Sequence, residues 1–144
     1  MRDIIFRGKR TDNGEWVEGV YYKQDEFYGV EREEHYIITS RCAIENDLGL
    51  EYYEVDPETV GQFTGFKDRN GKRIFEGDII HTKEFNIMGV SRLAHNYEVV
   101  FKYGCFMLSK KRRTTHGVAV WHDIGEVIGN IHDNPELLER EATE

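Results

Sequence analysis

The side chains of this chain best suited to hold a metal ion belong to six histidines and two cysteines. A structural zinc site needs about four such ligands on one side of a fold. No two histidines stand two or four residues apart, so a site would have to gather residues from separate strands, such as His81, Cys105 and His122. Histidines spaced in this way are more often isolated surface or half-buried side chains. The sequence therefore predicts no metal site and no cofactor.

Residues for catalysis are equally hard to find in the sequence. The chain contains no P-loop, no GxGxxG run, no GxSxG nucleophile elbow and no HExxH motif. Glu76 and Asp78 stand two residues apart, as two carboxylates on one strand face would for acid/base catalysis. The intervening Gly77 makes a turn the stronger interpretation. We therefore expect no catalytic residue and no enzymatic activity.

One run of adjacent basic residues interrupts the second half of the chain. It comprises Lys110, Lys111, Arg112 and Arg113, with Lys102 shortly before it. A basic loop beside aromatic residues such as Tyr103 and Phe106 is a common way to bind single-stranded nucleic acid, by phosphate contacts and base stacking. The net charge of −8 opposes broad affinity for nucleic acid. A solvated hairpin tip is therefore the favoured interpretation, and a nucleic-acid site at these basic residues is the alternative.

The acidic residues are concentrated in one third of the chain. Residues 15–58 contain thirteen acidic and three basic side chains, whereas residues 59–144 contain twelve of each. A solvated acidic face, which keeps a small protein soluble, is the simpler interpretation. The other interpretation is that this segment presents a surface to a basic partner.

Strands must position these side chains, because apolar and polar residues alternate along most of the chain. In the first part we expect strands over residues 2–9, 15–22, 35–39 and 50–55. The charged residues 23–34 indicate an exposed loop. Residues 43–48 indicate a helical turn.

After residue 59 the predicted strands become short and closely spaced. They cover residues 60–66, 79–82, 97–102, 105–108, 118–122 and 124–131, with a long loop at 83–96. Asn70 and Gly71 suit a type I′ turn. Asn134 and Pro135 predict the start of a short C-terminal helix. This pattern is typical of a small, strongly bent antiparallel barrel.

The predicted fold is mainly β, with an N-terminal antiparallel sheet packed on a C-terminal SH3-like small barrel and a short C-terminal helix. We expect one domain over residues 1–144, with subdomains 1–58 and 59–144. No apolar stretch reaches the roughly 18 residues that span a membrane, and residues 1–9 lack a secretory apolar core. Because the two cysteines form no CxxC pair, we expect reduced thiols and a cytoplasmic location.

Four runs of the sequence resemble the YopX family of phage and prophage proteins. They are TVGQFTGFKDRNGKRIFEGDII at residues 59–80, IGNIHDNPELL at 128–138, FRGK at 6–9 and WVEG at 16–19. The resemblance covers nearly the whole chain. It implies a mainly β fold, a phage or prophage origin and the cytoplasm of a bacterial host. The biochemical function of the family is uncharacterised, so the resemblance implies no catalytic residue.

We interpret the conspicuous residues of these runs as structural. They are Gly61, Gly65, Asp68, Gly71, Gly77, Asp78, Asn130 and Pro135. Glycine permits corners and close backbone approach, and the two aspartates can accept hydrogen bonds from turn amides. The leading functional prediction is a non-enzymatic accessory protein that binds a protein partner of unknown identity, with self-association as one form of such binding. Nucleic-acid binding through the basic run is the alternative, and no membrane partner is expected.

Overall fold

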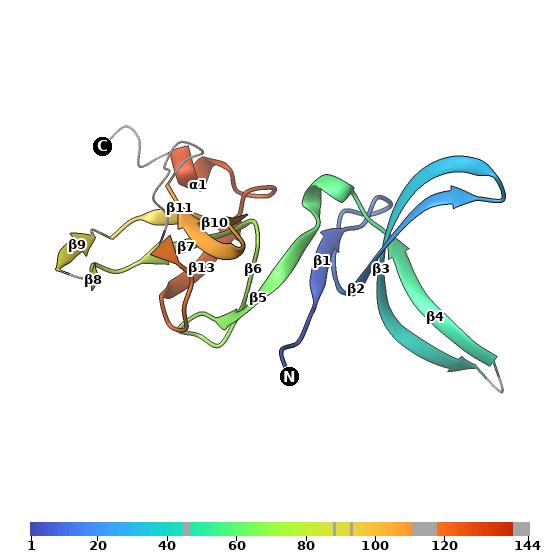
Figure 1. Ribbon diagram of the computed structural model, residues 1–144, viewed down its shortest axis with the longest axis horizontal. Coiled ribbons are helices and arrows are strands. Elements are labelled where there is room, and N and C mark those ends of the chain that lie inside the picture. The colour runs from blue at the N-terminus through green and yellow to red at the C-terminus, as the bar shows by residue number, and fades with distance from the viewer. Residues whose placement is uncertain (45–46, 88, 93, 111–117, 140–144) are drawn as a thin grey trace. The chain divides into compact units, whose positions relative to one another are not determined.

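The computed structural model describes residues 1–44, 47–87, 89–92, 94–110 and 118–139 (Figure 1). Its described elements are strands, apart from one 3-10 turn and one short helix, so the prediction of a mainly β fold is confirmed. No described helix is long and apolar enough to cross a membrane. The chain divides into two compact units, Met1–Phe63 and a second that begins at Thr64. The division follows Phe63, whereas the sequence suggested one after residue 58.

The first unit is an antiparallel sheet of long strands. Its elements are β1 (Phe6–Lys9), β2 (Trp16–Phe27), β3 (Val30–Ile44), β4 (Asp47–Glu54), the 3-10 turn η1 (Pro57–Thr59) and the start of β5 (Gly61–Lys67). The strand order is β4-β3-β2-β1-β5. The β2–β3 register shifts between Gln24 and Glu26, and the β3–β4 register shifts between Ile38 and Ser40. At both places β3 has one residue more than its partner, as in a β-bulge. Bulges bend a strand and increase its twist, which accounts for the curl of β2, β3 and β4 (Figure 1).

One face of this sheet carries buried apolar side chains. Ile37 and Val55 are fully buried. The Val55 side chain packs directly against the backbone of Gly8. A Cβ at position 8 would lie only 3.0 to 3.2 Å from three Val55 side-chain carbons. The rings of Phe6 and Tyr21 also pack together, with centroids 5.6 Å apart.

Two predictions for the first unit are wrong. Residues 23–34 form no loop, because β2 and β3 continue into a hairpin that turns at Tyr28 and Gly29, both at positive φ (50° and 76°). The helical turn expected over residues 43–48 is not found in the described part of that range, because β3 extends to Ile44 and β4 begins at Asp47. The local composition of these residues is not typical of strands. Hydrogen bonds to the neighbouring strand nevertheless hold the backbone extended in both places.

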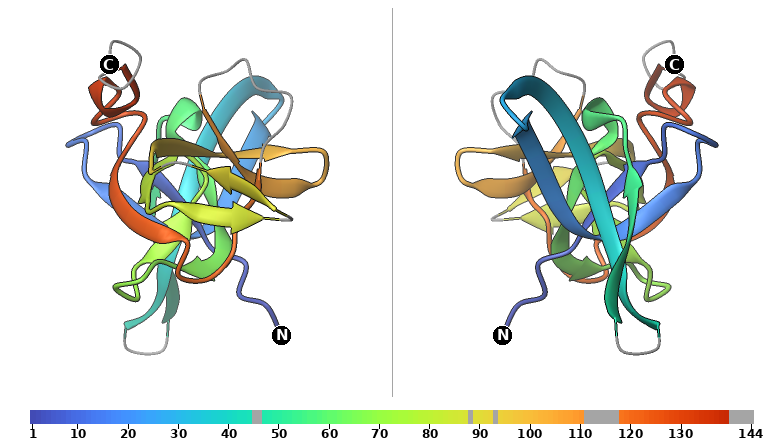
Figure 2. Two further views of the ribbon diagram at one scale, coloured as in Figure 1. Left: turned by 90° about the vertical axis from the view of Figure 1, so that its left-hand side faces the viewer. Right: turned by 90° about the vertical axis from the view of Figure 1, so that its right-hand side faces the viewer.

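The second unit contains short antiparallel strands. They are β6 (Arg73–Phe75), β7 (Asp78–Thr82), β8 (Phe85–Ile87), β9 (Val90–Arg92), β10 (Asn96–Lys102), β11 (Cys105–Ser109), β12 (Val118–Ala119) and β13 (Gly125–Asn130), followed by the helix α1 (Glu136–Glu139). The main sheet has the order β12-β11-β10-β7-β13. Ile74 of β6 belongs to the same buried apolar cluster as Ile80, Val99 and Leu108 of that sheet. The strands therefore curl around one core in the expected barrel-like arrangement (Figure 2).

The structure also corrects three local predictions in this unit. Residues 83–96 contain the hairpin of β8 and β9, and the strand expected over 118–122 is confined to Val118–Ala119. The turn after β5 is not type I′, because only Gly71 has a positive φ (79°) while Asn70 does not. The Gly71 N–H instead bonds the Asp68 carbonyl oxygen at 3.0 Å, the pattern of a type I turn followed by a left-handed glycine.

Most residues of the structural motif lie at corners of the second unit. Gly77 has φ 88°, donates its N–H to the Val99 carbonyl oxygen at 2.8 Å and accepts from the Ile131 N–H at 2.9 Å. Asn130 Oδ1 accepts from the N–H groups of two following residues, and Pro135 directly precedes α1. Gly61 and Gly65 lie within β5, Gly65 at positive φ.

Asp78 is buried at the start of β7, and its Oδ2 accepts the Phe75 N–H at 2.7 Å. We expect Asp78→Ala to lower the free energy of unfolding by about 0.5 to 2 kcal/mol, the range for losing a capping-type hydrogen bond. Urea unfolding of the two proteins measures this difference. An unchanged stability would contradict the structural interpretation of Asp78.

Candidate functional site

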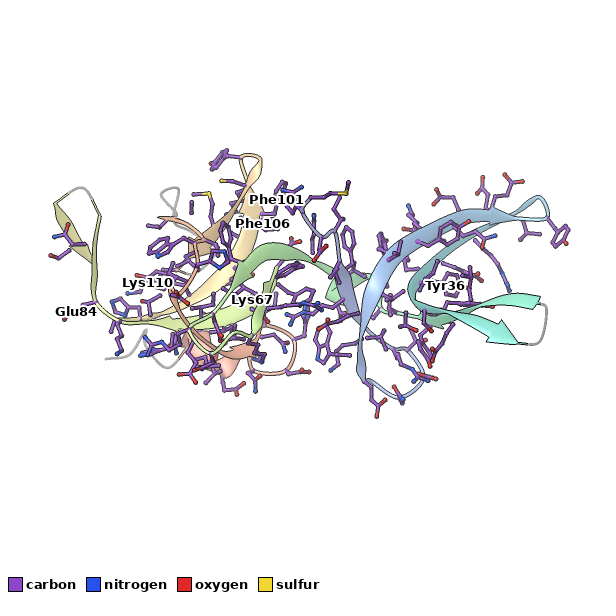
Figure 3. All side chains as sticks on the ribbon, turned by 90° about the horizontal axis from the view of Figure 1, so that it is seen from below. Tyr36, Lys67, Glu84, Phe101, Phe106 and Lys110 are labelled. Carbon is purple, nitrogen blue, oxygen red and sulfur yellow. The ribbon has the colours of Figure 1, made fainter. Side chains whose placement is uncertain are left out.

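A groove of about 530 Å³ opens on the face of β2, β3 and β4 opposite to the buried Ile37. The side chains that line it alternate along these strands: Tyr22, Gln24, Arg32, Glu34, Tyr36, Ile38, Leu50 and Tyr52. The register aligns them, since Tyr22 lies opposite Tyr36 and Ile38 lies opposite Tyr52. Figure 3 shows Tyr36 between the two arms of the curled sheet. All lining residues belong to the first unit.

The groove exposes aromatic and apolar side chains to solvent. Tyr22 is 49% exposed, Leu50 51% and Tyr52 59%. The rings of Tyr36 and Tyr52 meet edge to face, with centroids 5.5 Å apart and an interplanar angle of 88°. Exposed apolar patches of this kind are typical of interaction surfaces.

A carboxylate lies among these rings. The Tyr36 hydroxyl donates to Glu34 Oε2 at 2.5 Å, and Arg32 Nη1 lies 3.5 Å from Glu34 Oε1. The hydrogen bond to Glu34, burial, and the negative charges of Glu34 and Glu54 raise the pKa of Tyr36 to about 12. Tyr36 therefore stays protonated at neutral pH and holds one oxygen of Glu34 in place.

A second polar cluster lies on the other face of the same strands. The buried ring of His35 bonds the Tyr21 hydroxyl through Nδ1 and Glu33 Oε1 through Nε2 at 3.1 Å. Lys23 Nζ lies 3.3 Å from Glu33 Oε1 and 3.0 Å from Asp25 Oδ1. Hydrogen bonding to Lys23 lowers the pKa of Glu33, and burial raises the pKa of Tyr21. The cluster ties β2 to β3.

The candidate metal ligands have separate partners. His81 Nδ1 lies 2.8 Å from Asn96 Oδ1, the Lys67 N–H donates to His122 Nδ1 at 3.4 Å, and the Cys105 thiol contacts the Lys102 carbonyl oxygen at 3.5 Å. Within the described part of the chain, no three His, Cys, Asp or Glu side chains are grouped to hold a metal ion.

The candidate nucleic-acid residues are described only in part. Lys102 is exposed at the end of β10, and Lys110 Nζ lies 3.1 Å from His95 Nε2 just after β11. Lys111, Arg112 and Arg113 lie outside the described residues. Figure 3 shows Phe101 and Phe106 on the hairpin of β10 and β11, where their rings pack 5.1 Å apart.

Sequence reasoning assigned the groove residues to strands or to a loop and singled out none of them as a site. Two adjacent pairs, Tyr21 with Tyr22 and Tyr52 with Tyr53, were the available signal. Neighbouring residues of a strand point to opposite faces, so each pair places an aromatic ring on both faces. One ring of each pair faces the groove, and the other lies on the face that carries Ile37.

Comparison with known proteins covers nearly the whole chain. A family model described as YopX protein matches residues 5–139. The crystal structure of protein EF1440 from Enterococcus faecalis is similar over 96% of this chain and 99% of that chain, with 26% identity and a TM-score of 0.57. No curated protein matches the chain.

Proposed function

Because the chain belongs to the YopX family, we propose that it is a phage or prophage accessory protein that acts in the bacterial cytoplasm by binding another polypeptide, without catalysing a reaction. The observation that carries this proposal is the exposed groove on β2, β3 and β4. Its rings and aliphatic side chains surround a few polar groups. Tyrosine-rich patches with this mixture are enriched at protein interfaces.

The edge of the sheet supports the same function. β4 lies at one end of the strand order, and its residues Leu50 and Tyr52 face the groove. An edge strand can pair with an extended segment of a partner, while the side chains beside it supply specificity. Self-association through this edge is one form that such binding can take.

Site-specific photo-crosslinking tests the proposal. The photoreactive residue p-benzoylphenylalanine replaces Leu50 in the groove or, as a matched control, the exposed Glu126 of β13. We expect irradiation of host cells to join the protein to one defined polypeptide from position 50 and not from position 126. Crosslinks between two copies would identify self-association. Equal crosslinking from both positions, or none from position 50, would contradict a role for the groove.

Nucleic-acid binding is a second candidate, favoured by the hairpin of β10 and β11. There Phe101 and the 82% exposed Tyr103 flank Lys102. Exposed rings beside a cation can stack on bases and contact phosphate. The same photoreactive residue at position 103 distinguishes the two candidates, because crosslinks from that position to nucleic acid would favour this one.

A further inference from the structure

We propose that the groove on β2, β3 and β4 binds the guanidinium group of an arginine presented by a basic segment of the partner. This inference rests on the proposed function and names the chemistry of the partner. It follows from the rings that line the groove, the carboxylate among them and the charge of the surrounding segment.

The charge of this part of the chain selects a cationic ligand. Residues 15–58 contain thirteen acidic and three basic side chains. Glu34 lines the groove, and Glu54 lies directly opposite Tyr36 in the ladder, so its side chain is on the same face. A basic segment would be attracted to this surface, and an acidic one would be repelled.

The rings favour a flat cation over an ammonium group. A guanidinium stacks on aromatic faces and also bonds carboxylates in a planar geometry, whereas lysine carries a compact, strongly hydrated charge. The same sheet already uses this contact on its other face, where the Arg10 guanidinium lies 4.0 Å from the centroid of the Tyr53 ring. Tyr22, Tyr36 and Tyr52 offer comparable rings on the groove side.

Glu34 can exchange the Arg32 guanidinium for that of a ligand at little cost. Its Oε2 is held by the Tyr36 hydroxyl, so the carboxylate is oriented before a ligand arrives. Its Oε1 lies 3.5 Å from Nη1 of Arg32, whose side chain is 64% exposed. Exposed ion pairs of this length contribute little to stability. An incoming arginine can therefore replace Arg32 at Glu34 Oε1, which makes Arg32 a competitor of the ligand.

The test compares two short Gly-Ser peptides that differ at one position, arginine in one and citrulline in the other. Citrulline has nearly the same shape but carries a neutral urea group in place of the guanidinium. We expect the full chain to bind the arginine peptide and to show amide shifts around Tyr22, Tyr36 and Tyr52 in NMR spectra. Equal affinity for the citrulline peptide, or no binding of the arginine peptide, would overturn the inference.

Substitutions in the protein sharpen this test. We expect Glu34→Gln and Tyr52→Ala each to weaken binding of the arginine peptide by about 10-fold, in line with losing a charge-assisted or cation–π contact. Arg32→Ala should strengthen it, because the competing cation is gone. Glu58→Gln is the matched control, since it removes the same charge from an exposed site outside the groove. Weakening by Arg32→Ala, or equal weakening by Glu58→Gln, would contradict a specific guanidinium site.

The outcomes separate this inference from the proposed function. If position 50 crosslinks to a polypeptide but the arginine peptide does not bind, protein binding stands and the guanidinium site fails. If the arginine peptide binds in the groove but position 50 crosslinks to nothing, the groove recognises arginine and the protein-partner proposal fails.

Discussion

Replacing Gly19 with alanine is expected to destabilise the first unit by about 3 kcal/mol or more. A Cβ on Gly19 would lie 2.0 Å from the Ile38 carbonyl oxygen and 2.8 Å from its carbonyl carbon. These are backbone atoms of the neighbouring strand, so no side-chain rotation can relieve the overlap. β2 and β3 would have to separate beside the groove.

Gly14→Ala is the informative control for this variant. Gly14 has φ 72°, but a Cβ there would meet nothing within 4 Å. Alanine at position 14 should therefore cost only the conformational penalty of a left-handed residue, about 1 kcal/mol. Urea unfolding monitored by Trp16 fluorescence, in a Trp121→Phe background, reports on the first unit. A Gly19→Ala protein no less stable than Gly14→Ala would show that Ile38 moves aside easily.

The second large effect is expected at Asp68, which is 2% exposed at the end of β5. Its Oδ1 accepts the N–H groups of Asn70 at 2.8 Å and Lys72 at 2.9 Å, and its Oδ2 accepts the Val127 N–H at 3.0 Å. Asp68→Ala leaves the buried Val127 N–H without this acceptor and removes a charged acceptor from the turn. We expect a loss of about 3 kcal/mol in the free energy of unfolding. Unfolding monitored by Trp121 fluorescence, in a Trp16→Phe background, measures it.

Asp68 should also make stability depend on pH in acid. Burial by itself raises the pKa of the Asp68 carboxyl, but the N–H groups of Val127, Lys72 and Asn70 bond the charged form and bring the pKa below its ordinary value. The stabilisation is therefore complete above the pKa of the unfolded chain, about 3.9, and is lost as pH falls through the lower pKa of the folded state. Asp68→Asn should show a smaller loss of stability in that window. Parallel acid profiles of the two proteins would exclude Asp68 as the source.

The groove and these two structural positions have different experimental signatures. Gly19 and Asp68 should change the free energy of unfolding. Glu34 and the exposed Tyr52 should change ligand affinity with little effect on unfolding, since the Tyr52 side chain is largely in water. A variant series that measures both quantities therefore separates residues that build the fold from residues that bind.

The sequence by itself determined the parts of the fold that depend on neighbouring residues. The corner from Asp68 to Gly71 was predicted because aspartate and glycine have specific local chemistry, and only its turn type was wrong. The strands expected over 97–102 and 105–108 were also found, as β10 and β11, because apolar residues alternate there between short turns. The family was evident from the run at 59–80.

Pairing between distant segments decided what the sequence could not. The long hairpin of β2 and β3 contains charged residues on both faces, so residues 23–34 carried no apolar alternation by which to recognise a strand. Residues 83–96 likewise contain the hairpin of β8 and β9. In these two hairpins, backbone hydrogen bonds to the partner strand hold the chain extended. Such bonds join residues that are apart in the sequence, so a local sequence pattern does not predict them.

The groove was decided by tertiary structure for the same reason. Alternation along β2, β3 and β4 shows that Tyr22, Tyr36 and Tyr52 each point away from their sequence neighbours, but not which face the fold covers. The register brings these three residues onto one face, and the two bulges of β3 curl that face into a groove. Register and curvature arise from contacts between strands that are far apart in the chain, so the site existed only once the strands were paired.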